Sequence, residues 1–207
     1  MHAQTTHFRL PLIAILRGIT PDETTAHVRA LVEEGFDAIE IPTNSPAWQD
    51  SVAIAAREFQ VDAHIGAGTV LSLAHVDALV DAGGSLAVTP NTNPAVIRHA
   101  VGRGLLVAAG CATASEAFTA LEAGAQLLKL FPASIYGPAM ARALRSVLPP
   151  IPLFAVGGVT PDTLPGYLSA GCAGAGIGGE LYKPGQSVEA TRRHARAFRQ
   201  AWLDHAT

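Results

Sequence analysis

Short apolar runs recur along the chain at intervals of about 20 to 26 residues, and stretches with helical spacing of apolar residues separate them. Ala26, Ala30 and Leu31 illustrate that helical spacing in the first such stretch. Apolar runs of this length are typical of buried strands. We therefore expect eight strands: Leu12–Leu16, Ala38–Ile41, Ala63–Ala67, Leu86–Thr89, Leu105–Ala109, Leu127–Phe131, Leu153–Val156 and Ala173–Ile177.

Turn residues mark both ends of the expected helices. A capping residue followed by proline is typical of a helix start, and a glycine in the left-handed conformation is typical of a helix end. Four pairs predict starts: Thr20-Pro21, Ser45-Pro46, Asn93-Pro94 and Thr160-Pro161. Five glycines predict ends: Gly35, Gly83, Gly104, Gly124 and Gly171.

The strict alternation of strands and helices predicts parallel strands joined by helical crossovers. Eight such units close into a (β/α)8 TIM barrel, and 207 residues lie near the lower end for that architecture. We therefore expect one α/β barrel domain over residues 1–207. A doubly wound open sheet is the alternative, but its strands would be more fully apolar, whereas Glu40, Thr89 and Lys129 place polar groups in or at the ends of strands.

Composition narrows the classes of function. Hydrophobic residues make up 49% of the chain and charged residues 15%, which provides for a large core. The formal net charge of -3 comes without a basic run, so we expect neither nucleic acid nor a membrane as partner. Cys111 and Cys172 lie far apart and lack both metal-ligand spacing and a dense disulfide pattern, which favours a cytoplasmic protein.

Lys129 stands in the apolar run from Leu127 to Phe131. Burial of an ammonium group is costly unless the group is paired or loses its proton, and a neutral amine attacks carbonyl groups to form Schiff bases. The two-residue period of a strand places Lys129 in the barrel interior and Leu128 and Leu130 against the helices. The alternative is a lysine whose stem packs on the core while its head reaches water.

Glu40 and Arg17 are the charged groups expected near Lys129. Glu40 would face the barrel axis, where it could pair with Lys129 or carry protons with a pKa raised by burial. A purely structural ion pair is the alternative. Arg17 ends the first strand; it could bind a carboxylate through two hydrogen bonds and lower the pKa of Lys129, or merely be exposed to solvent.

Further polar groups fall at strand ends. Thr69 and Thr89 offer hydroxyl groups at the rim of the barrel, or serve as turn residues. Of the histidines, only His64 falls on an expected strand, at its beginning, with no second histidine placed to join it. We therefore expect no metal site.

Glycine pairs, Gly157-Gly158 and Gly178-Gly179, end the last two expected strands. Bare backbone amides beside a helix start form an anion site, and the loops after strands seven and eight of a barrel commonly bind phosphate. The pattern therefore predicts a phosphorylated substrate, and tight turns without a ligand are the alternative.

Segments spread over essentially the whole chain resemble the class I aldolases that cleave 2-keto-3-deoxy-6-phospho sugar acids. The resemblance is greatest to the branch that acts on the galactonate-derived acid. It implies a homotrimer of compact barrels that releases pyruvate and D-glyceraldehyde 3-phosphate without metal or cofactor. The segments are Ile15–Glu23, Glu40–Pro46, Gly66–Leu71, Val88–Asn91, Gly110–Ala114, Leu128–Ala133 and Ala155–Val159.

The resemblance also implies roles for individual residues. Lys129 matches the lysine that forms the Schiff base, and Glu40 matches the glutamate that transfers protons. The other matching residues would line the pyruvate pocket (Thr69, Pro90 and Phe131) or bind phosphate (Gly157, Gly158, Gly178 and Gly179).

Two positions depart from related sequences. Gluconate-type relatives have an arginine where this chain has Asn44, so recognition of the substrate carboxylate would fall to Arg17. Gly179 replaces a serine that is frequent in the phosphate loop, which predicts weaker phosphate affinity. Three other functions stay open: cleavage of the gluconate-derived epimer, isomerisation or decarboxylation of a sugar phosphate, and sensing of a sugar phosphate without catalysis.

Overall fold

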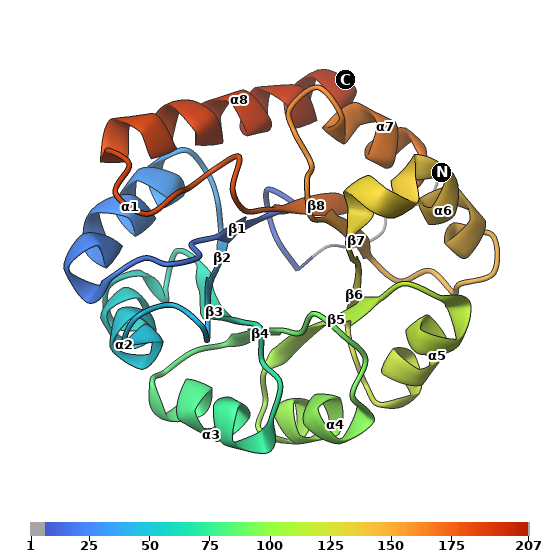
Figure 1. Ribbon diagram of the computed structural model, residues 1–207, viewed down its shortest axis with the longest axis horizontal. Coiled ribbons are helices and arrows are strands. Elements are labelled where there is room, and N and C mark those ends of the chain that lie inside the picture. The colour runs from blue at the N-terminus through green and yellow to red at the C-terminus, as the bar shows by residue number, and fades with distance from the viewer. Residues whose placement is uncertain (1–6, 207) are drawn as a thin grey trace.

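Parallel strands and helices alternate along the chain and form two concentric layers, with the helices outside (Figure 1). This computed structural model describes residues 7–206. Within that range eight strands pair in chain order, and β8 pairs with β1 to close the barrel. The predicted (β/α)8 barrel is confirmed and the open-sheet alternative is wrong. Residues 1–6 and 207 of the expected domain lie outside the described residues.

The strands begin and end within a residue or two of the predicted positions. Their bounds are β1 Leu12–Ile15, β2 Ala38–Pro42, β3 His64–Gly68, β4 Leu86–Val88, β5 Leu106–Cys111, β6 Leu127–Leu130, β7 Leu153–Val156 and β8 Gly174–Ile177. The helices are α1 Pro21–Glu33, α2 Trp48–Phe59, α3 Leu73–Asp81, α4 Pro94–Gly102, α5 Ala114–Glu122, α6 Ala133–Arg145, α7 Leu164–Ser169 and α8 Val188–Ala206. In the described part of the chain, none of these helices has the length and apolarity that crossing a membrane requires.

Strand side chains alternate between two apolar clusters, as the two-residue period predicts. On β6, Leu128 and Leu130 pack in the outer cluster with the helices, whereas Leu127 packs in the cluster inside the barrel. On β2, Ile39 and Ile41 face outward in the same way. Polar residues between these outward positions are therefore directed toward the barrel axis.

Phe8 closes the amino-terminal end of the barrel. Its ring centre lies 5.6 Å from that of His64, at the start of β3, and 6.0 Å from that of Phe154 on β7, both edge to face. The phenyl group belongs to the interior cluster and is 4% exposed. An apolar plug therefore fills this end, and the interior is accessible from the carboxyl ends of the strands.

Half of the predicted helix starts are confirmed. Thr20 and Asn93 are the residues just before α1 and α4. The starts at Ser45-Pro46 and Thr160-Pro161 are wrong. Ser45 accepts a hydrogen bond from the Gly18 N–H instead, at 2.9 Å, and α2 begins three residues later.

The second incorrect start precedes α7. The Thr160 N–H donates to the hydroxyl oxygen of Thr163 at 2.9 Å, and these residues form a turn, so α7 begins at Leu164. All five glycines that were predicted to end helices have positive φ, between 79° and 98°, which confirms those positions.

Candidate active site

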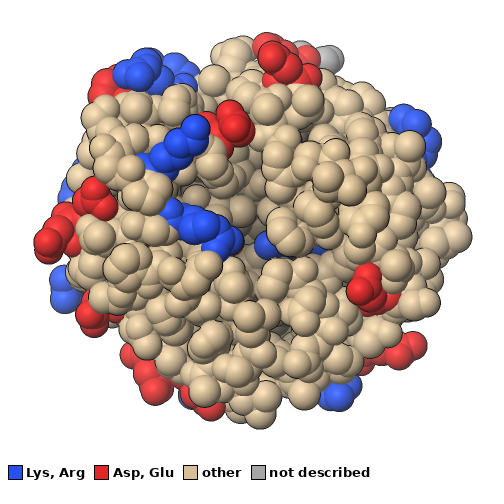
Figure 2. All heavy atoms as spheres, in the orientation of Figure 1, with Lys and Arg blue, Asp and Glu red and all other residues tan. Residues whose placement is uncertain are grey.

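A cavity of about 360 Å³ opens at the carboxyl ends of the strands. Figure 2 shows one face of the molecule hollowed near its middle, with Lys and Arg atoms beside the opening. All the predicted site residues except Glu40 and Thr89 line this cavity, together with two residues that the sequence did not suggest. The lining residues are Ile15, Arg17, Thr69, Pro90, Lys129, Phe131, Val156, Gly157, Gly158, Gly178 and Gly179.

Lys129 reaches the cavity from β6 and is 6% exposed. Its Nζ atom lies 5.0 Å from the centre of the Phe131 ring. Burial lowers the pKa of Lys129; the charge of Glu40 opposes this shift, and the charge of Arg17 adds to it. The amine is therefore more readily neutral than an exposed lysine, which is the state a nucleophile needs.

Glu40 lies behind the cavity lining, on β2, and is 1% exposed. Burial raises its pKa to about 7, although Lys129, Arg17 and a hydrogen bond from the Gly68 backbone all lower it. Among the described residues, its Oε2 atom has no hydrogen-bond partner. A carboxyl group with this pKa and an unsatisfied oxygen can both donate and accept a proton near neutral pH.

Gly68 shapes the space around Glu40. A Cβ atom at this position would overlap the Glu40 carboxylate, so only glycine allows the side chain its present place. Sequence reasoning missed this requirement. The signal available was the Gly66-Ala67-Gly68 pattern at the end of an otherwise ordinary strand.

Lys129 and Glu40 each affect the pKa of the other through their charges. In the described part of the chain no ion pair within 4.0 Å joins the two side chains. The geometry therefore does not favour the structural ion pair that was the alternative interpretation.

Arg17 extends from the end of β1 to the cavity and is exposed. Its Nη1 atom donates a hydrogen bond of 2.6 Å to Oδ1 of Asn44. No carboxylate of the described residues pairs with Arg17. The guanidinium is thus oriented by a neutral group and keeps its charge available for an anion in the cavity.

Thr69 follows β3 and has a φ of 58°, in the left-handed region that β-branched residues rarely adopt. Its carbonyl oxygen accepts a hydrogen bond of 2.7 Å from the Thr43 hydroxyl. Strained backbone of this kind is found where a site needs a particular orientation.

The two glycine pairs line the cavity after β7 and β8, and the second pair lies next to the end of β1 because β8 pairs with β1. Gly157 and Gly158 have φ values of 98° and 72°. A Cβ atom at Gly158 would come within 2.7 Å of Ser134 at the start of α6, whereas one at Gly179 would meet nothing within 4 Å. Because these glycines line the cavity and carry no side chains, an anion in the cavity could approach their main chain closely.

Thr89 does not contribute a hydroxyl to the cavity, contrary to the expectation. It is 1% exposed; its hydroxyl donates to the Asn91 carbonyl at 2.6 Å and accepts from the Gly110 N–H at 3.1 Å. Because β4 ends at Val88, Thr89 begins the turn that brings Pro90 to the cavity. Its alternative interpretation as a turn residue is the one the structure supports.

Ile15 and Val156 are the lining residues that sequence reasoning missed. Both end short apolar strands and resemble ordinary core positions.

Cys111 is 3% exposed, and burial raises the pKa of its thiol to about 12, so it is a packed residue. Within the described residues, no three His, Cys, Asp or Glu side chains converge as potential metal ligands.

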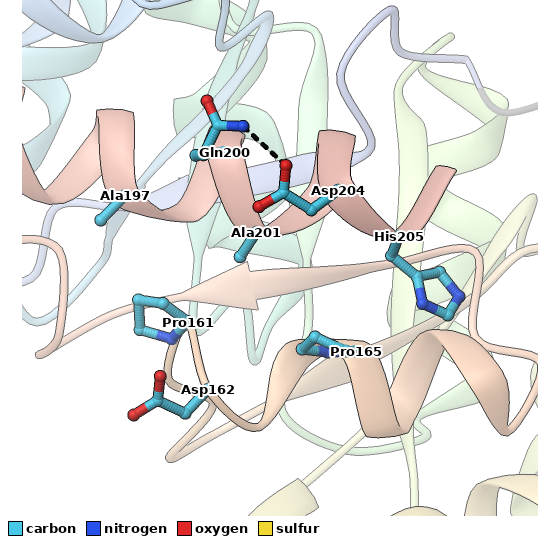
Figure 3. A pocket seen from close by; sticks show the side chains of 8 residues that line it. All are labelled: Pro161, Asp162, Pro165, Ala197, Gln200, Ala201, Asp204 and His205. Atoms are coloured by element: carbon cyan, nitrogen blue, oxygen red, sulfur yellow. Dashed lines mark hydrogen bonds between the residues drawn. The ribbon is translucent and has the colours of Figure 1, made fainter. Parts of the chain in front are cut away.

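A larger hollow of about 610 Å³ lies outside the barrel, between α8 and the residues that precede and begin α7 (Figure 3). Pro161, Pro165 and Ala201 form part of its wall, and Gln200 donates a hydrogen bond of 2.7 Å to Asp204. It shares no lining residue with the cavity at the strand ends. The larger hollow is therefore not the candidate active site, because the predicted site residues line the smaller cavity.

Known proteins resemble this chain over nearly its full length. A 2-dehydro-3-deoxy-6-phosphogalactonate aldolase of Escherichia coli (strain K12) is 58% identical over 197 residues, which cover 95% of this chain and 96% of that protein. A probable 2-dehydro-3-deoxy-6-phosphogalactonate aldolase of Rhizobium meliloti (strain 1021) is 47% identical, with 93% and 91% covered.

Solved structures agree with these relatives. One described as "Native KDPGal structure" has a TM-score of 0.96 and 56% identity, and 98% of each chain is covered. A cube-shaped protein cage, designed by fusing symmetric oligomeric domains, has a TM-score of 0.94 and 57% identity over 96% of this chain and 74% of that chain. The family model described as "Aldolase: KDPG and KHG aldolase" matches residues 4–194. With the barrel, the cavity and these likenesses in agreement, the chain belongs to the KDPG and KHG aldolase family.

Proposed function

We propose that this protein cleaves 2-dehydro-3-deoxy-6-phospho-D-galactonate to pyruvate and D-glyceraldehyde 3-phosphate through a Schiff base on Lys129. The observation that carries this proposal is a buried amine of lowered pKa that faces a cavity lined by a guanidinium and by two pairs of glycines. The names of the E. coli and R. meliloti relatives support the choice of substrate.

The first step is attack of the neutral Lys129 amine on the C2 ketone. The resulting carbinolamine loses its hydroxyl as water and becomes an iminium ion. Glu40 supplies and removes the protons of this step, and its pKa of about 7 makes both protonation states accessible near neutral pH.

The second step breaks the C3–C4 bond. Glu40, directly or through a water molecule, takes the proton of the C4 hydroxyl, which becomes the aldehyde of D-glyceraldehyde 3-phosphate. The bonding electrons move to the iminium nitrogen and leave an enamine on Lys129. Protonation of the enamine at C3 and hydrolysis then release pyruvate and restore the free amine.

Two ends of the substrate would be held by different parts of the barrel. Arg17 and Thr69 bind the carboxylate, with Pro90 and Phe131 against the keto-acid portion. The phosphate lies at Gly157, Gly158, Gly178 and Gly179. Binding at the phosphate, remote from the reacting carbons, positions the bond that breaks. The cavity volume of about 360 Å³ suits a ligand of this size.

Borohydride reduction in the presence of pyruvate tests the proposal. We expect a stable adduct on the peptide that contains Lys129, and none in the Lys129→Met variant. The exposed Lys183 is the internal control, since it is the other lysine of the chain. Absence of the adduct, or its appearance on Lys183, would contradict the imine mechanism and favour an isomerase, a decarboxylase or a sensor. A direct assay of pyruvate release separates the sensor from an enzyme.

The gluconate-derived epimer is the second candidate, because it differs only in configuration at C4 and small pocket contacts decide such preferences. Asn44 in place of the arginine of gluconate-type relatives, with Arg17 oriented by Asn44, favours the galactonate-derived acid. Measuring kcat/KM for both epimers decides between them; a higher value for the gluconate-derived acid would overturn the choice.

The proposal extends to assembly and location. We propose a homotrimer, and the use of a similar chain among the symmetric oligomeric domains of the designed cage supports an oligomer. A cytoplasmic location is supported by the two buried cysteines, which remain free thiols.

A further inference from the structure

Three consecutive residues that follow β2, Thr43, Asn44 and Ser45, form hydrogen bonds to the ends of neighbouring strands. This 43–45 segment lies between β2 and α2. Its position in the sequence suggested that Ser45 caps α2, yet α2 begins at Trp48 and Ser45 bonds to Gly18 instead. The polar groups of the segment are therefore directed toward the ends of the neighbouring strands β1 and β3 rather than along the chain.

Thr43 forms hydrogen bonds to the two peptide groups on either side of Thr69, the residue that follows β3. Its backbone N–H donates to the Gly68 carbonyl at 2.8 Å, and its hydroxyl donates to the Thr69 carbonyl at 2.7 Å. These two carbonyls lie immediately before and after the Cα atom of Thr69. Because both peptide planes are anchored by one residue, the φ and ψ angles of Thr69 are restrained together.

The restraint matters because Thr69 has a φ of 58°, which a threonine avoids in the absence of compensating contacts. A backbone free to return to negative φ would rotate the Thr69 side chain relative to the cavity that it lines. Thr43 itself does not line that cavity and is only partly buried. Its effect on a bound molecule would therefore be exerted through Thr69.

The next two residues restrain the end of β1 in the same way. Asn44 accepts the hydrogen bond of 2.6 Å from Arg17, and Ser45 accepts the one of 2.9 Å from the Gly18 N–H. Gly18 has a φ of 83°, so the chain turns sharply just after Arg17. The 43–45 segment thus links the cavity-lining residues of β1 and β3 to β2, which also carries Glu40.

We propose that the 43–45 segment positions the groups that recognise the keto-acid carboxylate, with Thr43 acting as the positioning residue for Thr69. This inference rests on the proposed function of the cavity. The glycine pairs of the phosphate side follow β7 and β8 and receive no hydrogen bond from the segment among the described residues. Disturbing Thr43 should therefore affect pyruvate and leave phosphate untouched.

Thr43→Val tests the role, because valine keeps the shape of threonine and lacks the hydroxyl. The conservative variant Thr43→Ser restores the donor. Thr92→Val is the matched control: the Thr92 hydroxyl also donates to a backbone carbonyl, that of Gly110 at 2.7 Å, and Thr92 does not line the cavity. Each variant is compared in three measurements: urea unfolding, the pyruvate concentration for half-maximal borohydride trapping, and the inhibition constant of inorganic phosphate.

We expect Thr43→Val to need about five to ten times more pyruvate for half-maximal trapping, the factor that corresponds to one lost hydrogen bond. Its inhibition by inorganic phosphate should stay at the wild-type value, and Thr43→Ser should trap like the wild type. Thr92→Val should lose stability to urea and keep its affinity for pyruvate.

An unchanged pyruvate dependence in folded Thr43→Val would overturn the inference. So would an equal weakening toward pyruvate and phosphate, which indicates general disturbance of the barrel. Thr43→Ala is a second variant; if neither it nor Thr43→Val folds while Thr92→Val does, Thr43 has a structural role and the inference is wrong. Failure of the wild-type protein to be trapped by pyruvate would instead overturn the proposed function.

Discussion

Burial acts in opposite directions on the two ionisable groups inside the barrel. It lowers the pKa of Lys129 and raises that of Glu40 to about 7, so it favours the neutral form of both. Arg17 lowers both pKa values, which helps the amine and partly offsets the effect of burial on the carboxyl group. Under the proposed mechanism, these charges favour a nucleophilic amine beside a carboxyl group that exchanges protons near neutral pH.

Glu40→Gln should change activity and stability in opposite directions. In the unfolded chain Glu40 ionises near 4.5, and in the barrel its pKa is about 7. Between these values the folded state binds more protons, so the free energy of unfolding falls as the pH rises, by about 3 kcal/mol in all. We expect Glu40→Gln to remove this loss, so that its urea midpoint exceeds that of the wild type at pH 8 and approaches it at pH 4.

The same variant should lower kcat by about 10²–10⁴-fold, because a proton carrier is lost. Glu122→Gln, at the exposed end of α5, is the control for loss of a carboxylate and should keep kcat at the wild-type value. A stability difference between Glu40→Gln and the wild type that is equal at both pH values would contradict the assignment of the raised pKa to Glu40.

A site residue could be predicted from the sequence when its polarity differs from that of its neighbours in the strand. Lys129 and Glu40 interrupt apolar strands, so their burial could be inferred before the fold was known. Ile15 and Val156 create no such conflict, because an apolar residue at a strand end is equally suited to the core and to a cavity wall. Thr89 was misjudged because β4 is one residue shorter than expected.

At the scale of elements, the alternation of runs and turns sufficed to predict every strand and the direction of the sheet. The five helix-ending glycines were predictable because positive φ is a backbone requirement that few other residues meet. Helix starts were less predictable. A serine or threonine hydroxyl can cap its own helix or bond to another loop, and only the tertiary arrangement decides, as Ser45 and its partner Gly18 show.

Gly68→Ala tests how β3 accommodates Glu40. The added methyl group would overlap the carboxylate, so the side chain must move away from the cavity or the strands must separate. We expect kcat to fall by at least about tenfold and stability to fall by about 1–3 kcal/mol, the usual effect of overpacking a core. Steady-state kinetics and urea unfolding measure the two effects.

Gly102→Ala is the matched control for that prediction. A Cβ atom at Gly102, in the last turn of α4, would meet nothing within 4 Å, and the backbone there does not have positive φ. It should leave kcat unchanged and stabilise the protein slightly. Normal activity in Gly68→Ala would show that the position of Glu40 does not depend on the missing side chain.

At the scale of the molecule, the chain is one closed barrel, and the residues that line its cavity lie at or just after strand ends. Residues in or just after β1, β3, β4, β6, β7 and β8 line one cavity although they are distant in the sequence, and Glu40 of β2 lies behind that lining. Closure of the sheet could be predicted from the number of units, since eight parallel strands are what such a barrel needs. How copies of the barrel associate was suggested by the resemblance alone.

Sedimentation equilibrium should therefore report a particle of three times the 21.4 kDa chain mass. The trimer is expected from the resemblance to related aldolases. A closed, rotationally symmetric trimer would give the same molecular mass over a range of protein concentrations. A monomer at micromolar concentration, or a dimer, would contradict it.

In the described part of the chain, Phe8 fills the amino-terminal end of the barrel, and the cavity opens at the carboxyl ends of the strands. Under the proposed chemistry, the substrate and both products pass through this opening. The pyruvate fragment bound covalently to Lys129 lies deeper in the cavity than the phosphorylated aldehyde. The aldehyde must depart before the keto acid can follow. Product release is thus ordered, and slow dissociation of D-glyceraldehyde 3-phosphate would delay the release of pyruvate.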